Sequence, residues 1–291
     1  MDVKKVAWGL GIFGGLAVIA FAAGSLIDER IAEEFYIGAN SYATMYEIIG
    51  KMPAFIMLAV ACGLAARYFF RVLHSIVFTV LAYAAMFAAS AINFKDLTDL
   101  ITDSTLYSLA GCAVLGAVLA FVIGEATKGV AEERLSEYFK WAVAVAVVVV
   151  ATGVITFVAK EIFSRARYAD VQGGVAQFAP WYDFVRVDGG DSMPSGHTAF
   201  TAVLFMMMPL CGINPRFAGR ENTVTVVSVI ATAVTAFSRI TDGHHYLSDV
   251  AAAAFIAVAV QTVVIFVMYG KTLDKFVFNR FFVPKRAEVK A

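Results

Sequence analysis

The sequence DSMPSGH, residues 191–197, stands directly before an uncharged run at 198–214. A second polar stretch, SRITDGHHYLSD at 238–249, stands directly before another uncharged run at 250–270. Apolar runs of about 20 residues are long enough to cross a bilayer as a helix. Ionisable groups at the end of such a run are costly in a membrane, so both polar stretches indicate a functional site.

The overall composition is that of a membrane protein. Hydrophobic residues make up 60% of the 291 residues, well above the share in a soluble globular domain. The formal net charge is zero, so nothing indicates nucleic acid as a partner. The three cysteines lie singly in apolar runs, which favours small buried side chains over a disulfide framework or a zinc site.

Eight uncharged or nearly uncharged runs predict an all-α fold, a polytopic bundle of transmembrane helices. Strands are disfavoured because an open sheet cannot satisfy its edges in lipid and the runs lack the alternation of a barrel. We expect amino-terminal transmembrane helices with an outer loop (28–51) over residues 1–103, a helical core over 104–270 and a basic cytoplasmic tail over 271–291. The predicted spans are 6–27, 52–66, 73–94, 104–124, 141–159, 198–214, 222–238 and 250–270.

A helix start and three cations are candidates for binding an anion. Ser195 and Gly196 stand at the expected start of the sixth span, where backbone N–H groups and the helix dipole favour an anion and glycine lets it come close. Lys160 and Arg167, after the fifth span, and Arg239, at the end of the seventh, would supply positive charge. Arginine donates two parallel hydrogen bonds to phosphate oxygens, whereas lysine contributes a compact charge. We therefore expect these five residues to bind phosphate.

Two histidines and an aspartate complete the candidate site. His245 and Asp249 are four residues apart at the expected start of the eighth span, so on a helix they share a face and the carboxylate accepts a hydrogen bond from the imidazole. This describes a nucleophile or base with an orienting partner. His197 is then free to donate a proton to a leaving oxygen. We predict no metal site, because Asp191 and Asp242 suit acceptors that stabilise loops.

Basic residues between the spans predict the orientation. With the amino terminus inside the cell, fifteen of the 23 Lys and Arg residues fall on the cytoplasmic side. The positive-inside rule then places both termini in the cytoplasm of a protein in the plasma or inner membrane. This topology brings the candidate cations and histidines together at the extracytoplasmic face. Arg165, on the same side, is interpreted as an ordinary charged residue near a span end.

These residues closely resemble the three signature motifs of the type 2 phosphatidic acid phosphatase superfamily. That superfamily includes integral-membrane lipid phosphatases and the vanadium haloperoxidases. The resemblance covers residues 104–270 and departs from the family pattern at Tyr168, where the family usually has proline. The motifs are Lys160 and Arg167 with six residues between them, Pro194-Ser195-Gly196-His197, and Ser238-Arg239 followed by His245 and Asp249.

The resemblance implies a phosphatase core of helices like that of the haloperoxidases and a metal-independent enzyme that needs no cofactor. Its substrate would be a lipid phosphate or pyrophosphate in the bilayer, such as undecaprenyl pyrophosphate, phosphatidylglycerol phosphate, phosphatidic acid or a lipid A phosphate. His245 would attack phosphorus to give a phosphohistidine, Asp249 would orient it, and His197 would protonate the leaving group. The phosphoryl oxygens would be held by Lys160, Arg167, Ser195, Gly196 and Arg239.

Two other classes of function stay open. A vanadate-dependent haloperoxidase would use the same anion pocket, although eight spans suit a lipid substrate better than a halide. A lipid translocase or transporter would use the ionisable groups as a relay. Vanadate should inhibit a phosphatase but be required by a haloperoxidase, and transport should survive replacement of His245.

Overall fold

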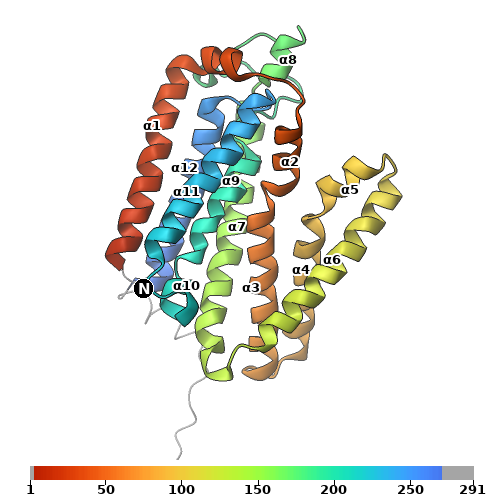
Figure 1. Ribbon diagram of the computed structural model, residues 1–291, viewed down its shortest axis with the longest axis vertical. Helices are drawn as coiled ribbons and strands as arrows, with labels where there is room; N and C mark the ends of the chain where they lie inside the picture. The colour runs from red at the N-terminus through yellow and green to blue at the C-terminus, as the bar shows by residue number, and fades with distance from the viewer. Residues whose placement is uncertain (1–2, 271–291) are drawn as a thin grey trace, which may run out of the picture.

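The apolar runs form helices because a helix satisfies its own backbone N–H and C=O groups, as a lipid environment requires. The computed structural model describes residues 3–270, and its long helices run roughly along one axis (Figure 1). Within these residues no strand occurs, which confirms the all-α fold class. The elements in chain order are α1 (Val3–Phe35), α2 (Ser41–Ile49), α3 (Met52–Arg71), α4 (Ile76–Ile92), α5 (Lys95–Ile101), α6 (Thr105–Lys128), η1 (Glu132–Arg134), α7 (Leu135–Phe163), α8 (Tyr168–Gln172), η2 (Trp181–Asp183), α9 (Gly196–Ala202), η3 (Val203–Met207), α10 (Leu210–Ile213), η4 (Pro215–Phe217), α11 (Glu221–Thr241) and α12 (Leu247–Tyr269).

The helices give seven or eight candidate spans where eight were predicted, with two irregularities. In the described part of the chain, seven helical segments are long and apolar enough to cross a membrane, and α4 with α5 makes an eighth if the pair is one span. Those two helices meet at an angle of 44°. The run at 198–214 divides into α9, η3 and α10, because Pro209 has no N–H with which to continue a helix.

Residues 28–51, predicted as an outer loop, contain two helical segments. The first is the continuation of α1, which leaves helical geometry at Ile27 (φ −135°, ψ 19°) and then runs on to Phe35. The second is α2, whose start is capped by Asn40, with Oδ1 accepting from Ala43 N at 2.8 Å. Helix α2 leads almost directly into α3. The end of α1 and helix α2 lie toward the same end of the bundle as α8 (Figure 1).

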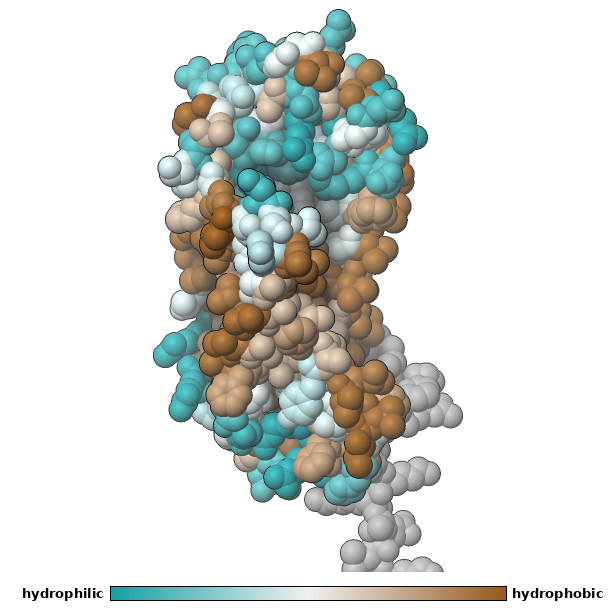
Figure 2. Space-filling model, turned by 90° about the vertical axis from the view of Figure 1, so that its right-hand side faces the viewer, coloured by the Kyte–Doolittle hydropathy of each residue, from teal (hydrophilic) through white to brown (hydrophobic). Residues whose placement is uncertain are grey.

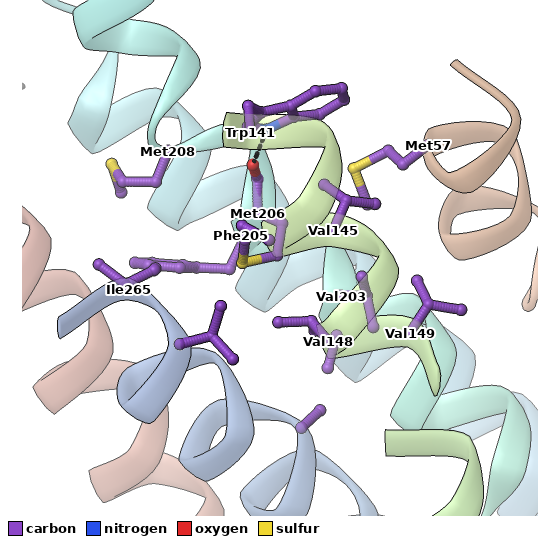
Figure 3. Packing of buried hydrophobic residues seen from close by; sticks show 14 of the residues in the cluster. Met57, Trp141, Val145, Val148, Val149, Val203, Phe205, Met206, Met208 and Ile265 are labelled. Carbon is purple, nitrogen blue, oxygen red and sulfur yellow. Dashed lines mark hydrogen bonds between the residues drawn. The ribbon is translucent and has the colours of Figure 1, made fainter. Parts of the chain in front are cut away.

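Most of the buried apolar side chains form one cluster in the middle of the bundle. It joins α1, α3, α7, η3, α11 and α12, and Phe205 and Val148 lie at its centre (Figure 3). Helix α6 packs instead with α4 and α3, at the side of the bundle (Figure 1). The predicted boundary between residues 103 and 104 stays a prediction, and the predicted cytoplasmic tail, 271–291, lies outside the described residues.

The surface carries an apolar belt between two polar ends (Figure 2). Large apolar side chains such as Ile19, Leu106 and Phe121 are about two-thirds exposed or more on the long helices. Water would disfavour so much exposed apolar surface, whereas lipid does not, so the chain is a membrane protein.

One hydrogen bond inside the core gives a test of the packing. Trp141 Nε1 donates to Met206 O at 2.7 Å (Figure 3), which satisfies a carbonyl in the short η3 segment. Trp141→Phe should leave that buried carbonyl unpaired and lower the free energy of unfolding by about 1–3 kcal/mol, measured by SDS titration of the purified protein. Trp8→Phe is the control, because Trp8 is 73% exposed. Equal losses in the two variants would contradict the assignment.

Candidate active site

Six of the eight predicted site residues line one pocket at the end of the bundle that holds α8. The pocket has a volume of about 280 Å³. Its walls come from the α2–α3 junction, the end of α7, the start of α9, the end of α11 and the loop before α12. The lining residues are Glu47, Lys51, Lys160, Arg167, Asp191, Gly196, His197, Phe200, Arg239, His244 and His245.

His245 is held in one tautomer by a backbone carbonyl. It lies in the loop between α11 and α12, and its Nδ1 forms a short hydrogen bond with Ser192 O. Because a carbonyl oxygen only accepts, Nδ1 carries the hydrogen and Nε2 keeps a lone pair. Burial, followed by the positive charge of Lys160, holds the pKa of His245 well below its ordinary value of 6.5. The imidazole is therefore neutral at neutral pH, as a nucleophile must be.

Asp249 lies behind the pocket and does not contact the His245 ring directly. The predicted hydrogen bond assumed that both residues lie on one helix, but α12 begins at Leu247, so His245 precedes it. The Asp249 carboxylate instead accepts from Ser192 Oγ at 2.6 Å, from Tyr246 N at 2.8 Å and from a neighbouring arginine. Ser192 thus connects Asp249 to His245. Its hydroxyl donates to the Asp249 carboxylate, and its carbonyl accepts from the His245 imidazole.

His197 faces helix α2 from the first turn of α9. Its Nε2 lies 3.0 Å from Glu47 O, so Nε2 donates to this carbonyl. The residue lines the same pocket as His245. The structure therefore places both predicted histidines at one cavity. His245 lies in the loop before α12, and His197 lies in the first turn of α9.

The cations of the pocket are paired with protein acceptors. Arg167 forms a bidentate pair with Asp191, with distances of 2.7 Å from Nε and 2.9 Å from Nη2. Lys160 Nζ donates to Asp191 O and lies 3.6 Å from the same carboxylate. Arg239 donates from Nη2 to Ala43 O at 2.8 Å and forms an ion pair with Asp242. Its buried Nε–H has no partner among the described residues, which leaves one donor for a ligand oxygen.

The Asp191 carboxylate lies between Arg167 and Lys160 and pairs with both. Burial by itself would raise the pKa of the Asp191 carboxyl, but the hydrogen bonds from Arg167 and the positive charge of Lys160 bring it below its ordinary value. The carboxyl is therefore ionised at neutral pH. The Asp191 carboxylate accepts two hydrogen bonds from the Arg167 guanidinium. Arginine binds phosphate with the same bidentate geometry.

Ser195 and Gly196 differ in their access to the pocket. Ser195 is fully buried and caps α9, and its Oγ accepts from Thr198 Oγ1 at 3.0 Å. Pro194 therefore precedes the helix. Gly196 lines the pocket, and a Cβ built on it would meet nothing within 4 Å, so its backbone is open to a ligand. The phosphate-binding roles of both residues stay predictions.

Four residues at or near the site were not predicted from the sequence. Arg165, interpreted as an ordinary residue near a span end, is only 3% exposed and binds both Asp249 and Asp28. Glu47 and Lys51 come from the amino-terminal helices and line the pocket. The sequence neighbours of Arg165 are of the same kinds as those of the other basic residues near span ends, so they do not indicate a buried arginine. Asp28 directly ends the first apolar run and could have been singled out from the sequence.

The arrangement can bind an oxyanion between cations beside a neutral imidazole. Within residues 3–270, no group of three or more His, Cys, Asp or Glu side chains has the arrangement of a metal site. The family model described as the PAP2 superfamily matches residues 141–273, which include all three predicted motifs. No curated protein and no solved structure matches the chain.

The Asp191 pairing predicts competition between the carboxylate and an added anion. Asp191→Asn should strengthen the binding of inorganic phosphate about tenfold, because the anion no longer displaces a charged partner from Arg167 and Lys160. Calorimetry on the purified protein would measure this, with Asp188→Asn, an exposed residue of the same loop, as the control. Weaker binding in Asp191→Asn would instead mean that Asp191 holds the cations in place for phosphate.

Proposed function

The chain belongs to the PAP2 superfamily through residues 141–273, and from this membership and the pocket we propose that it is a membrane lipid phosphatase. The family supports phosphatase chemistry in general. The observation that carries the proposal is the meeting of His245, His197 and three cations at one cavity of about 280 Å³. Phosphoryl transfer needs this combination of a nucleophile, a proton donor and fixed positive charge.

The first half of the reaction transfers the phosphoryl group to the protein. His245 Nε2 forms a bond to phosphorus, and the bond between phosphorus and the leaving oxygen breaks. His197 gives a proton to that oxygen, so the product leaves as an alcohol or as a phosphate. Lys160, Arg167 and Arg239 neutralise the charge that spreads over the phosphoryl oxygens in the transition state.

The second half returns the protein to its starting state. His197, now without its proton, takes one from a water molecule, which attacks the phosphorus. The N–P bond breaks, inorganic phosphate is released, and His245 recovers its lone pair. The hydrogen bond from His245 Nδ1 to Ser192 O is compatible with both states, because Nδ1 keeps its hydrogen throughout.

The surroundings of the pocket favour a lipid as the source of the phosphate. The cavity lies at the end of the bundle that holds α8, and the surface carries an apolar belt between two polar ends (Figure 2). The headgroup of a bilayer lipid resides at such a polar end. The distribution of Lys and Arg residues supports an extracytoplasmic site with both termini in the cytoplasm. Undecaprenyl pyrophosphate, phosphatidylglycerol phosphate, phosphatidic acid and lipid A phosphates all present the required group there.

A larger cavity nearby does not compete for this chemistry. It has a volume of about 400 Å³ and lies between α1, α7 and α12, under Met193 and Pro194. Its lining consists of apolar side chains together with Trp181 and carries no ionisable group, so it offers nothing to a phosphate. Phosphoryl transfer is therefore assigned to the cavity that holds the histidines.

Replacing the nucleophile is the direct test of this function. Phosphate release from the four lipids is measured with a chelator present, and His245→Ala should reduce kcat at least about 10⁴-fold because no phosphohistidine can form. His74→Ala is the matched control, since His74 lies in the turn between α3 and α4, away from the pocket. Wild-type enzyme quenched in alkali, where a phosphohistidine is stable, should carry phosphate on His245. Release by His245→Ala at the wild-type rate would end the proposal.

Two further measurements separate the alternative functions. Vanadate should inhibit the wild-type enzyme by occupying the phosphate position, whereas a haloperoxidase would require it. Lipid flux across vesicles that survives His245→Ala, with no phosphate released by the wild type, would favour a translocase.

The histidine pair also predicts a bell-shaped dependence of kcat/KM on pH. His245 must be neutral to attack, and because its pKa is lowered, the acid limb should lie below pH 6.5. His197 must carry a proton to donate it, which adds the second limb. Below pH 6.5 the unfolded chain takes up a proton that the folded one does not, so the free energy of unfolding should also fall there. A flat profile across the imidazole range would contradict the two roles.

A further inference from the structure

A buried arginine joins the amino-terminal helix to the carboxylate behind the nucleophile. Arg165 Nη2 lies 3.0 Å from Asp28 Oδ2, and its Nη1 lies 2.7 Å from Asp249 Oδ1. The three side chains are at most 5% exposed. Asp28 belongs to α1, which is far from the three motifs in the sequence and outside residues 141–273.

Asp28 also holds the first turn of α12. Its Oδ1 accepts from Ser248 N at 2.9 Å, and its Oδ2 accepts a short hydrogen bond from Ser248 Oγ. The N–H groups of a first helical turn have no partner within the helix, and a carboxylate satisfies them well. Here that carboxylate comes from another helix instead of from the residue before α12.

The close approach of α1 to this turn depends on a glycine. Gly24 lies one helical turn before Asp28, and a Cβ added to it would stand 2.4 Å from Ser248 N. Only glycine therefore allows α1 to reach the start of α12. The helix bends at Ile27 directly afterwards, which carries the chain away over the end of the bundle.

Stability alone does not explain this set of charges. Two carboxylates share one guanidinium where water has almost no access, and apolar residues of similar size are often at least as stable in such a place. Arg165 is fixed further by Ala179 O, 3.2 Å from Nε, and by the Tyr246 ring, 3.9 Å from its Cζ. An arginine held on every side keeps the position of Asp249 constant.

The position of Asp249 passes to the nucleophile through Ser192. Asp249 accepts from the Ser192 hydroxyl at 2.6 Å, and the Ser192 carbonyl accepts from His245 Nδ1. We propose that Asp28 and Arg165 are positioning residues, which place Asp249 and the start of α12 so that the His245 imidazole faces the phosphorus. Helix α1 is then part of the catalytic unit. This inference rests on the proposed phosphatase function.

The first test compares kinetic constants of variants at Asp28. A nucleophile displaced by about 1 Å loses about 100-fold in rate, so Asp28→Ala should lower kcat by about that factor and leave KM within about twofold. Asp28→Asn keeps an acceptor for Ser248 but loses its charge, and should fall between Asp28→Ala and the wild type. Glu29→Gln is the matched control, an exposed carboxylate next to Asp28 on α1. Wild-type kcat in folded Asp28→Ala, or a rise in KM alone, would overturn the proposal.

The second test does not depend on catalysis. Hydrogen exchange followed by mass spectrometry should show faster exchange over residues 246–250 in Asp28→Asn than in the wild type, with the rest of α12 unchanged. A uniform rise along α12, or a local rise with wild-type kcat, would assign Asp28 a purely structural role and overturn the proposal. If the wild-type protein releases no phosphate from any lipid, the proposed function fails separately, and exchange still decides whether Asp28 holds the start of α12.

Discussion

A guanidinium without access to water must be matched by negative charge, and the Arg165 side chain meets this constraint with Asp28 and Asp249. The requirement forces three segments far apart in the sequence to one point: α1, the chain after α7, and the start of α12. The loop at 187–192 is fastened to the same point, since Ser192 N donates to Arg165 O at 3.1 Å. Gly190 permits this contact, because a Cβ there would stand 2.3 Å from Ser164 O.

The pocket follows from the same balance of charges. Lys51 pairs with Asp96 at 2.6 Å, Arg239 pairs with Asp242, and Asp191 serves both Arg167 and Lys160. Cationic side chains without negative partners would repel one another, whereas cations paired with carboxylates keep a fixed geometry. Under the proposed function, binding a phosphate would exchange one anion for another at Arg167 and Lys160. The affinity depends on how readily Asp191 moves, which its partly exposed side chain favours.

The amino-terminal helices contribute directly to the site, although they lie outside the matched residues 141–273. Helix α2 supplies two backbone acceptors, Glu47 O for His197 and Ala43 O for Arg239. Helix α1 supplies Asp28 to the first turn of α12. Residues 141–273 thus hold the predicted chemical groups, while part of their orientation comes from segments earlier in the chain.

The sequence by itself predicted the all-α fold, the approximate spans and the two histidines and three cations that meet at the pocket, because the apolar runs and the spacing of polar residues are local properties. It could not place the His245–Ser192 hydrogen bond or the partners of Asp249, since the residue at which α12 begins depends on how Asp28 and Tyr246 pack around it. Arg165 and Arg167 are two residues apart, yet one is buried between carboxylates and the other lines the pocket. Only the tertiary structure decides this difference, because the burial of a charge depends on partners that are distant in the sequence.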